Sequence, residues 1–284
     1  MRIDLISVPI YYGADRAGVE LGPQTLLDNG LVSILSGSHQ LLSSTIIEVE
    51  RDATKEAPAN LKYLRPIVNA NDQLREVVYN SLSNGNMPLT LGGDHSLALG
   101  TLAGALKNSE DTLLIWVDAH TDINTHLSTP SGNIHGMPVA AALNFGHPLL
   151  TGLFTNFLRP ENILYVGVRS IDEGERDLIN KLGIQMMGVD DFDISRIHSF
   201  LDAKPSVPVH CDFDIDSLDA SLVPGTSTPV DGGFTVDQAH SILELLRDSG
   251  RVTSLDFVEF NPSVDKSGQT LSTALGLLTT YFSK

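Results

Sequence analysis

Apolar positions follow two patterns along the chain: short continuous runs, and longer stretches in which they recur every three or four residues. The short runs are typical of strands and predict them at residues 3–10, 45–49, 87–91, 112–117, 163–168, 184–189, 207–213 and 252–258. The helical spacing predicts helices at residues 22–35, 69–84, 97–106, 172–182, 236–246 and 271–282. Strand-like and helix-like segments therefore alternate from one end of the sequence to the other.

The strand pattern also indicates how the sheet is built. Runs such as residues 113–117 are apolar at every position, which is typical of parallel strands that are covered on both faces. Strands that alternate with helices predict βαβ units. We therefore expect an α/β fold, with a three-layer α/β/α arrangement around a mostly parallel sheet. No repeat, low-complexity tract or linker interrupts the pattern, so residues 1–284 are interpreted as a single domain.

The composition narrows the class of protein. Hydrophobic residues make up 42% of the chain, which is enough for a large core, and the formal net charge is −17. Such a charge argues against nucleic acid and against anionic membrane surfaces as partners. No stretch approaches the roughly 20 apolar residues of a membrane-spanning helix, and no signal peptide is visible. The single cysteine, Cys211, fits a reducing compartment, so we expect a cytoplasmic protein.

Side chains that bind metals follow several of the predicted strands. Asp118, His120 and Asp122 come after the strand at 112–117, and alternate residues of an extended chain point the same way. Asp212, Asp214 and Asp216 have the same spacing and follow the apolar run at 207–209. Ligands of parallel α/β sheets bind at the carboxyl ends of the strands, so both clusters are expected in one crevice. The sequence therefore predicts a binuclear metal site.

Two further strand ends carry candidate side chains. His95 follows Gly92 and Gly93 after the third predicted strand, and Glu259 follows the strand at 252–258. Taken alone, His95 is readily interpreted as a turn histidine and Glu259 as a surface carboxylate. Their position at strand ends beside two acidic clusters favours the functional interpretation.

Six blocks of the sequence resemble the signature blocks of the ureohydrolase (arginase–agmatinase) family. They occur in family order and span nearly the whole chain: GVELGP at 18–23, GGDHS at 92–96, DAHTDIN at 118–124, SGNIHGMP at 131–138, DIDSLD at 214–219 and EFNP at 259–262. The block at 131–138 is similar to the arginase members rather than the agmatinase members. The resemblance implies an arginase-like catalytic domain over residues 1–284 that hydrolyses L-arginine to L-ornithine and urea.

The resemblance also implies two Mn²⁺ ions and their ligands. One ion would be bound by His95, Asp118, Asp122 and Asp214, and the other by Asp118, His120, Asp214 and Asp216. Asp118 and Asp214 would bridge the two. A ligand set of carboxylates and imidazoles without thiolate suits manganese, although affinity alone does not exclude zinc, cobalt or nickel. A hydroxide bridging two metals about 3.5–4 Å apart would attack the guanidinium carbon.

Catalytic and substrate-binding roles follow from the same resemblance. Asp122 would shuttle the proton of the hydroxide, Glu259 would hold the guanidinium, and His135 would donate a proton to the leaving amine. The α-carboxylate would be bound by Asn124, Thr129, Ser131 and Asn133. Asp172 would contact the α-amino group, and Thr228 would lie near the guanidinium. Without the family match, His135 is equally well a structural loop histidine, Asp172 a helix N-cap and Thr228 a turn residue.

Several positions depart from the family pattern, and other functions compete. Ser170, Ala14 and Phe260 differ from the residues usual in arginases; none of them removes a metal ligand, and they leave substrate affinity and fine specificity open. The alternatives are another ureohydrolase (an agmatinase, guanidinobutyrase or formiminoglutamase), a binuclear metallophosphoesterase, and an inactive member that serves as a binding partner. The resemblance also implies a homotrimer or a homohexamer.

Overall fold

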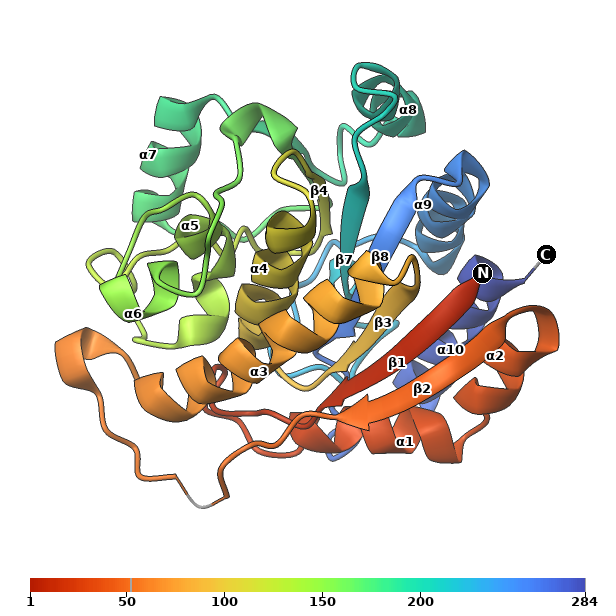
Figure 1. Cartoon of the computed structure of the whole chain (residues 1–284), viewed down its shortest axis with the longest axis horizontal. Helices are drawn as coiled ribbons and strands as arrows, with labels where there is room; N and C mark the ends of the chain where they lie inside the picture. Colours follow the sequence, from red (N-terminus) through yellow and green to blue (C-terminus); the bar gives the residue numbers. More distant parts are fainter. Residues whose placement is uncertain (52, 284) are drawn as a thin grey trace.

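The computed structural model describes residues 1–51 and 53–283, and an eight-stranded sheet forms its centre (Figure 1). The strand order is β2-β1-β3-β8-β7-β4-β5-β6, and each neighbouring pair is parallel. The strands are β1 Arg2–Val8, β2 Gln40–Ile46, β3 Met87–Gly92, β4 Leu113–Val117, β5 Ile163–Val166, β6 Gln185–Met187, β7 Val209–Asp214 and β8 Val252–Val258. The predicted parallel α/β sheet is confirmed.

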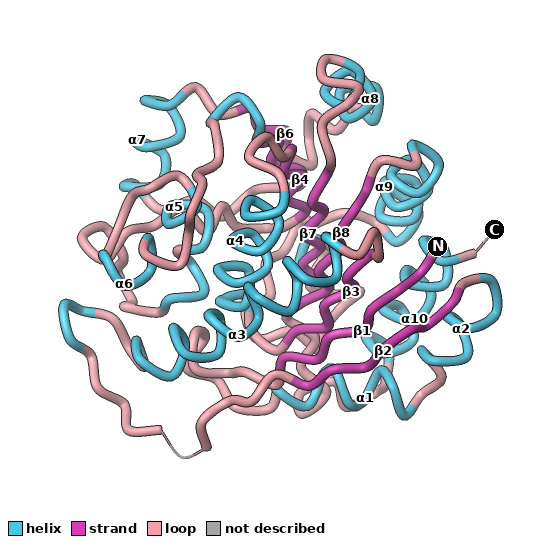
Figure 2. Tube along the Cα trace, viewed as in Figure 1, coloured by secondary structure: helices cyan, strands magenta, loops and turns pink. Residues whose placement is uncertain are grey.

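Helices cover both faces of this sheet, as Figures 1 and 2 show. The helices are α1 Gly22–Asp28, α2 Leu31–Ser38, α3 Leu64–Ser83, α4 Ala98–Asn108, α5 Pro138–Ala142, α6 Pro148–Thr151, α7 Glu173–Leu182, α8 Ile194–Asp202, α9 Val236–Ser249 and α10 Gln269–Phe282. Residues of α1, α2, α8, α9 and α10 share one buried hydrophobic cluster, and residues of α3 to α7 share a second. The three-layer α/β/α arrangement is therefore confirmed.

The central strand β4 shows why its sequence is apolar at every position. Leu113, Ile115 and Val117 belong to one hydrophobic cluster, and Leu114 and Trp116 belong to the other. Successive side chains of a strand point to opposite faces, so a strand covered on both faces needs apolar residues throughout. Since β4 is buried in this way, the polar residues that follow it begin where the sheet ends.

The largest differences between the predicted elements and the structure concern three segments. The helix expected at 22–35 is two helices, because Gly30 adopts a positive φ of 106° between α1 and α2. The strand expected at 45–49 lies earlier, as β2, because an edge strand pairs on one side only and its residues stay largely exposed and polar. The helix expected at 69–84 begins earlier, at Leu64.

Further helices occupy stretches for which no helix was predicted, namely α5, α6 and α8. The start of α8 carries a local signal, since the Asp193 side chain accepts a hydrogen bond from the N–H of Ser195. The helices α5 and α6 are short, and short helices have little periodic pattern. Among the described residues no helix is long and apolar enough to cross a membrane.

Candidate metal centre

Four strands that are adjacent in the sheet, β3, β8, β7 and β4, end at one edge and are followed by the predicted site residues. These strands come from distant parts of the sequence. They are brought together where the strand order changes direction, with β8 and β7 inserted between β3 and β4. The carboxyl edge at such a switch point is where parallel α/β sheets bind their ligands.

The turn after β3 fixes the position of His95. A Cβ atom on Gly93 would overlap the carbonyl oxygen of Ile10, so only glycine allows this close approach of the two segments. The next residue, Asp94, accepts a hydrogen bond from the N–H of Ser96 at 2.9 Å and caps the short helix that contains His95. The His95 ring then stacks on the Trp116 ring of β4, with centroids 4.3 Å apart.

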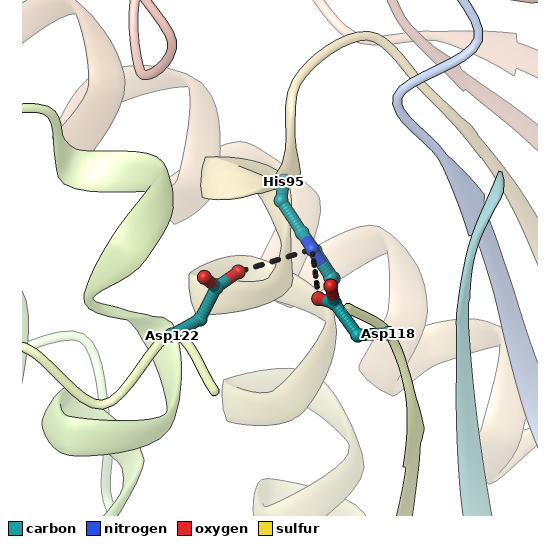
Figure 3. Close-up of side chains that lie close together, drawn as sticks. All are labelled: His95, Asp118 and Asp122. Carbon is teal, nitrogen blue, oxygen red and sulfur yellow. Dashed lines mark ion pairs between the residues drawn. The ribbon is translucent and has the colours of Figure 1, made fainter. Parts of the chain in front are cut away.

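Nδ1 of His95 faces three carboxylates. It lies 3.2 Å from Oδ2 of Asp118, 3.1 Å from Oδ2 of Asp122 and 3.2 Å from Oδ2 of Asp214. Figure 3 shows the first two of these contacts. Nδ1 is buried and has no hydrogen-bond partner among the described residues. A buried imidazole nitrogen that points into carboxylate oxygens without a hydrogen bond has the arrangement of a metal ligand.

His120 forms a second group beside the first. Its Nδ1 lies 3.4 Å from Oδ1 of Asp118 and 3.2 Å from Oδ2 of Asp216. Asp118 therefore presents Oδ2 to His95 and Oδ1 to His120, as a bridging carboxylate would. The contact of Asp214 with His95 assigns it to the first group, and its bridging role stays a prediction.

The electrostatics of these groups favour bound cations. Burial and neighbouring carboxylates raise the pKa of Asp214 and of Asp216. Burial alone would lower the pKa of His120, but the carboxylates of Asp216 and Asp118 outweigh it and raise the pKa to about 12. Several carboxylates buried together are unfavourable without compensating positive charge, which protons or divalent ions supply. The donor set thus fits two ions, one in each of two groups that share Asp118.

Glu259 and Asp122 have strained backbones next to these groups. Their φ angles are 63° and 46°, in a left-handed region that side chains other than glycine rarely adopt. Oε1 of Glu259 accepts a hydrogen bond from the N–H of His95 at 2.9 Å and lies 3.3 Å from Nδ1 of His135. The buried Oε2 has no partner among the described residues. This carboxylate oxygen is available to a cationic ligand.

A cavity of about 120 Å³ lies against the two groups. Its lining includes His120, Asp122, Asn124, Thr129, Ser131, Asn133, His135, Ser170, Asp172, Glu175 and Thr228. The structure therefore gathers around one cavity each residue that was predicted to bind the substrate, apart from Glu259. The roles assigned to these residues stay predictions.

Hydrogen bonds fix the loop that carries most of these residues. Nδ2 of Asn124 donates to Oδ2 of Asp172 at 2.8 Å, which joins the loop to the start of α7. Asp172 also takes part in a capping box with Glu175, so its helix-capping and pocket-lining positions coincide. Oγ1 of Thr228 donates to Oδ2 of Asp216 at 3.1 Å, so Thr228 contacts a candidate metal ligand.

Two residues of this site were not assigned a role from the sequence. Oδ1 of Asp212 lies 2.7 Å from Nε2 of His95, on the side of the ring away from the cluster of carboxylates. The sequence grouped Asp212 with Asp214 and Asp216, since alternate strand residues share a face, but assigned it neither an ion nor a partner. Glu175 lines the cavity, and its position three residues after Asp172 was a capping-box signal.

Fold and site together define an α/β protein with a candidate binuclear metal centre at the carboxyl edge of a parallel sheet. The Arginase family model matches residues 1–283. With curated relatives up to 40% identical over 99% of its length, the chain belongs to the arginase family.

Similar proteins span the same length. The arginase of Bacillus caldovelox is 40% identical over 293 residues, covering 99% of this chain and 97% of that protein. The arginase of Bacillus subtilis (strain 168) is 37% identical, covering 99% and 98%. The native structure of the Bacillus caldovelox enzyme at pH 5.6 has a TM-score of 0.93 at 38% identity, covering 99% and 98%. Entamoeba histolytica arginase in complex with L-ornithine has a TM-score of 0.93 at 30% identity, covering 100% and 99%.

Proposed function

We propose that this protein hydrolyses the guanidinium group of L-arginine to L-ornithine and urea in a manganese-dependent reaction. The observation that carries the proposal is the shared position of Asp118 between His95 and His120, beside a cavity lined by polar side chains. The similar proteins named arginase support the assignment, and one of their structures contains L-ornithine, the amine product of this reaction.

The predicted ligands would bind two manganese ions, and Glu259 would bind the substrate. His95, Asp118, Asp122 and Asp214 would hold one Mn²⁺, and Asp118, His120, Asp214 and Asp216 the other. Bound manganese supplies Lewis acidity that makes water nucleophilic near neutral pH. The unpartnered Oε2 of Glu259 would bind the guanidinium by a charge-assisted hydrogen bond.

Proton movements would involve two residues of the cavity. The added water loses a proton, which Asp122 would accept. The bond between the guanidinium carbon and the chain nitrogen then breaks, and the leaving amine takes up a proton. His135 is placed to donate it, because it lines the cavity and contacts Glu259. Both protons of the added water would end on the leaving nitrogen, one by way of Asp122 and one by way of His135, so that a guanidinium cation and water give neutral urea and an ammonium cation.

The loop at residues 121–136 would select a substrate with an α-carboxylate. Asn124, Thr129, Ser131 and Asn133 line the cavity and are neutral hydrogen-bonding groups. Agmatine has no carboxylate and would leave them without a partner. Asp172, on the same cavity, would contact the α-amino group. Arginine would therefore form hydrogen bonds with more of the polar groups that line the cavity than agmatine would.

We also propose that residues 1–284 act as one catalytic domain, that the protein works in the cytoplasm, and that it assembles as a homotrimer or homohexamer. The continuous sheet and the single buried cysteine support the first two points. Light scattering of the purified protein would measure the number of subunits.

The test is a urea assay with manganese on arginine, agmatine and guanidinobutyrate, with a chelator-treated sample as control. We expect arginine to give a kcat/KM at least roughly 100-fold above the other two, because buried polar groups left unpaired are costly. A preference for agmatine would move the assignment to another ureohydrolase. Hydrolysis of a generic phosphoester without release of urea would contradict the proposal altogether.

A further inference from the structure

Behind the candidate metal centre, Asp212 holds the far side of the His95 ring. Its Oδ1 lies 2.7 Å from Nε2 of His95, and both side chains are buried, with 0% and 1% exposure. The opposite ring nitrogen, Nδ1, is the one that faces Asp118, Asp122 and Asp214. Asp212 thus contacts a candidate metal ligand without facing the candidate metal position.

Asp212 belongs to a larger buried group. Nε2 of His210 lies 3.2 Å from Oδ2 of Asp256, and Nδ1 of His210 lies 2.7 Å from Oγ of Ser254. The ligand-type atoms of His210, Asp212 and Asp256 all lie within 4.8 Å of one another, and each of these residues is at most 1% exposed. The strands β7 and β8, which pair in parallel, place these side chains together behind His95.

We propose that Asp212 is a positioning residue that fixes the orientation and tautomer of His95 and thereby raises the manganese affinity of the group around His95. A carboxylate that accepts the Nε2–H of an imidazole leaves the Nδ1 lone pair free to ligate. It also makes that nitrogen more basic and prevents the ring from flipping. His210 lies in the same buried group, and an imidazole beside a buried carboxylate favours its ionised form.

The effect should be confined to one half of the centre. His120, the imidazole of the other group, makes its carboxylate contacts with Asp118 and Asp216 rather than with Asp212. Loss of the Asp212 charge should therefore weaken the ion held by His95 more than the ion held by His120. A general loss of stability would weaken both ions together.

The experiment compares Asp212→Asn with Cys211→Ala in the full-length protein. Cys211 is the adjacent buried residue of β7, but its side chain lies in the hydrophobic cluster on the opposite face of the sheet. Calorimetric titration with Mn²⁺ should show two binding events in Cys211→Ala with affinities like those of the unmodified protein. In Asp212→Asn one event should weaken roughly 10-fold, and in Asp212→Ala up to roughly 100-fold, while the other changes little.

Electron paramagnetic resonance gives a second readout that does not depend on catalysis. At a manganese concentration that saturates Cys211→Ala and gives the spectrum of a coupled pair of ions, Asp212→Asn should give the six-line spectrum of an isolated Mn²⁺. If Asp212→Asn does not fold, as judged by circular dichroism, Asp212→Ser, which replaces the carboxylate by a neutral hydroxyl, should weaken the same event.

Equal affinities and equal spectra in Asp212→Asn and Cys211→Ala would overturn the inference. So would a third manganese in the unmodified protein that Asp212→Asn removes, because Asp212 would then be a ligand itself. The inference rests on the metal centre proposed above, and the experiment distinguishes failure of the proposed function from failure of the positioning role. If the unmodified protein bound no manganese, the proposed function would be wrong. If it bound two ions and neither affinity changed in Asp212→Asn, only the positioning role of Asp212 would be wrong.

Discussion

Nδ1 of His135 lies 3.3 Å from Oε1 of Glu259, although the two residues are 124 positions apart. Burial alone would lower the pKa of His135, but the hydrogen bond to Glu259 and the charges of Glu259, Asp122 and Asp94 outweigh it and raise the pKa. The imidazole therefore keeps its proton at higher pH than an ordinary histidine does. This is the state that a proton donor to the leaving amine requires.

We predict that His135→Asn lowers kcat for arginine by roughly 100- to 10,000-fold, the range typical for loss of a general acid or base. KM and manganese content should change little, since His135 is not among the predicted metal ligands. Steady-state urea release and metal analysis measure the two effects. His198→Asn, at an exposed position of α8, is the control. A variant with full kcat would leave His135 a structural role only.

We expect substitutions of Asp118 and of Asp216 to differ in the number of manganese ions that the protein retains. Asp118 contacts both imidazoles, whereas Asp216 contacts His120. Asp118→Asn should therefore reduce bound manganese at both positions and abolish manganese-dependent urea release, while Asp216→Asn should leave about one ion per chain, because the group around His95 keeps its candidate ligands. Metal analysis after dialysis distinguishes them, with exposed Asp177→Asn as the control. Equal metal loss in both variants would argue against the shared position of Asp118.

Ser131→Ala should affect arginine more than agmatine. Ser131 lines the cavity, and a typical hydrogen bond contributes about 0.5–1.5 kcal/mol. We expect kcat/KM for arginine to fall roughly 2- to 13-fold, because the hydroxyl would no longer reach the α-carboxylate. Agmatine lacks that group and is an internal control within the same assay. A parallel decrease for both substrates would show that Ser131 supports the loop rather than the carboxylate.

We expect the ionisation of Glu175 to lower the free energy of unfolding as pH rises. Burial raises the pKa of Glu175 from 4.5 to about 7, against the lowering effect of the hydrogen bond from the Asp172 N–H. The folded state thus binds this proton more tightly than the unfolded state. The stabilisation is fully present below pH 4.5, is lost as pH rises through about 7, and amounts to roughly 2–4 kcal/mol.

Glu175→Gln tests this pH dependence. Glutamine can still occupy this position of a capping box but does not titrate. The free energy of unfolding of Glu175→Gln relative to the unmodified protein should therefore increase between pH 5 and pH 8 by about the 2–4 kcal/mol given above. Urea unfolding at both pH values measures it. Glu173→Gln, exposed in the same helical turn, should show no such trend. Parallel pH curves for the two variants would contradict the prediction.

Much of the site could be predicted from the sequence, because each candidate ligand stands directly after a buried strand. Local pattern alone places His95, Asp118, Asp214 and Glu259 at strand ends, and a parallel sheet puts those ends at one edge. Most of the elements that the sequence pattern missed have a weak local pattern, whereas α8 carries an N-cap signal that was not used. The edge strand β2 is largely exposed, and α5 and α6 are too short for a clear periodicity.

The sequence by itself determined the succession of strands along the chain, the parallel character of the sheet and the strand ends that carry candidate ligands. The tertiary structure alone decided which strand ends are neighbours, with β8 and β7 inserted between β3 and β4. It also decided that Asp118 stands between two imidazoles and that Asp212 stands behind His95. The physical reason is that the spacing of apolar and polar residues is a local property of the sequence. Which carboxylate contacts two imidazoles, and which one lies behind the His95 ring, depends instead on how distant strands pair.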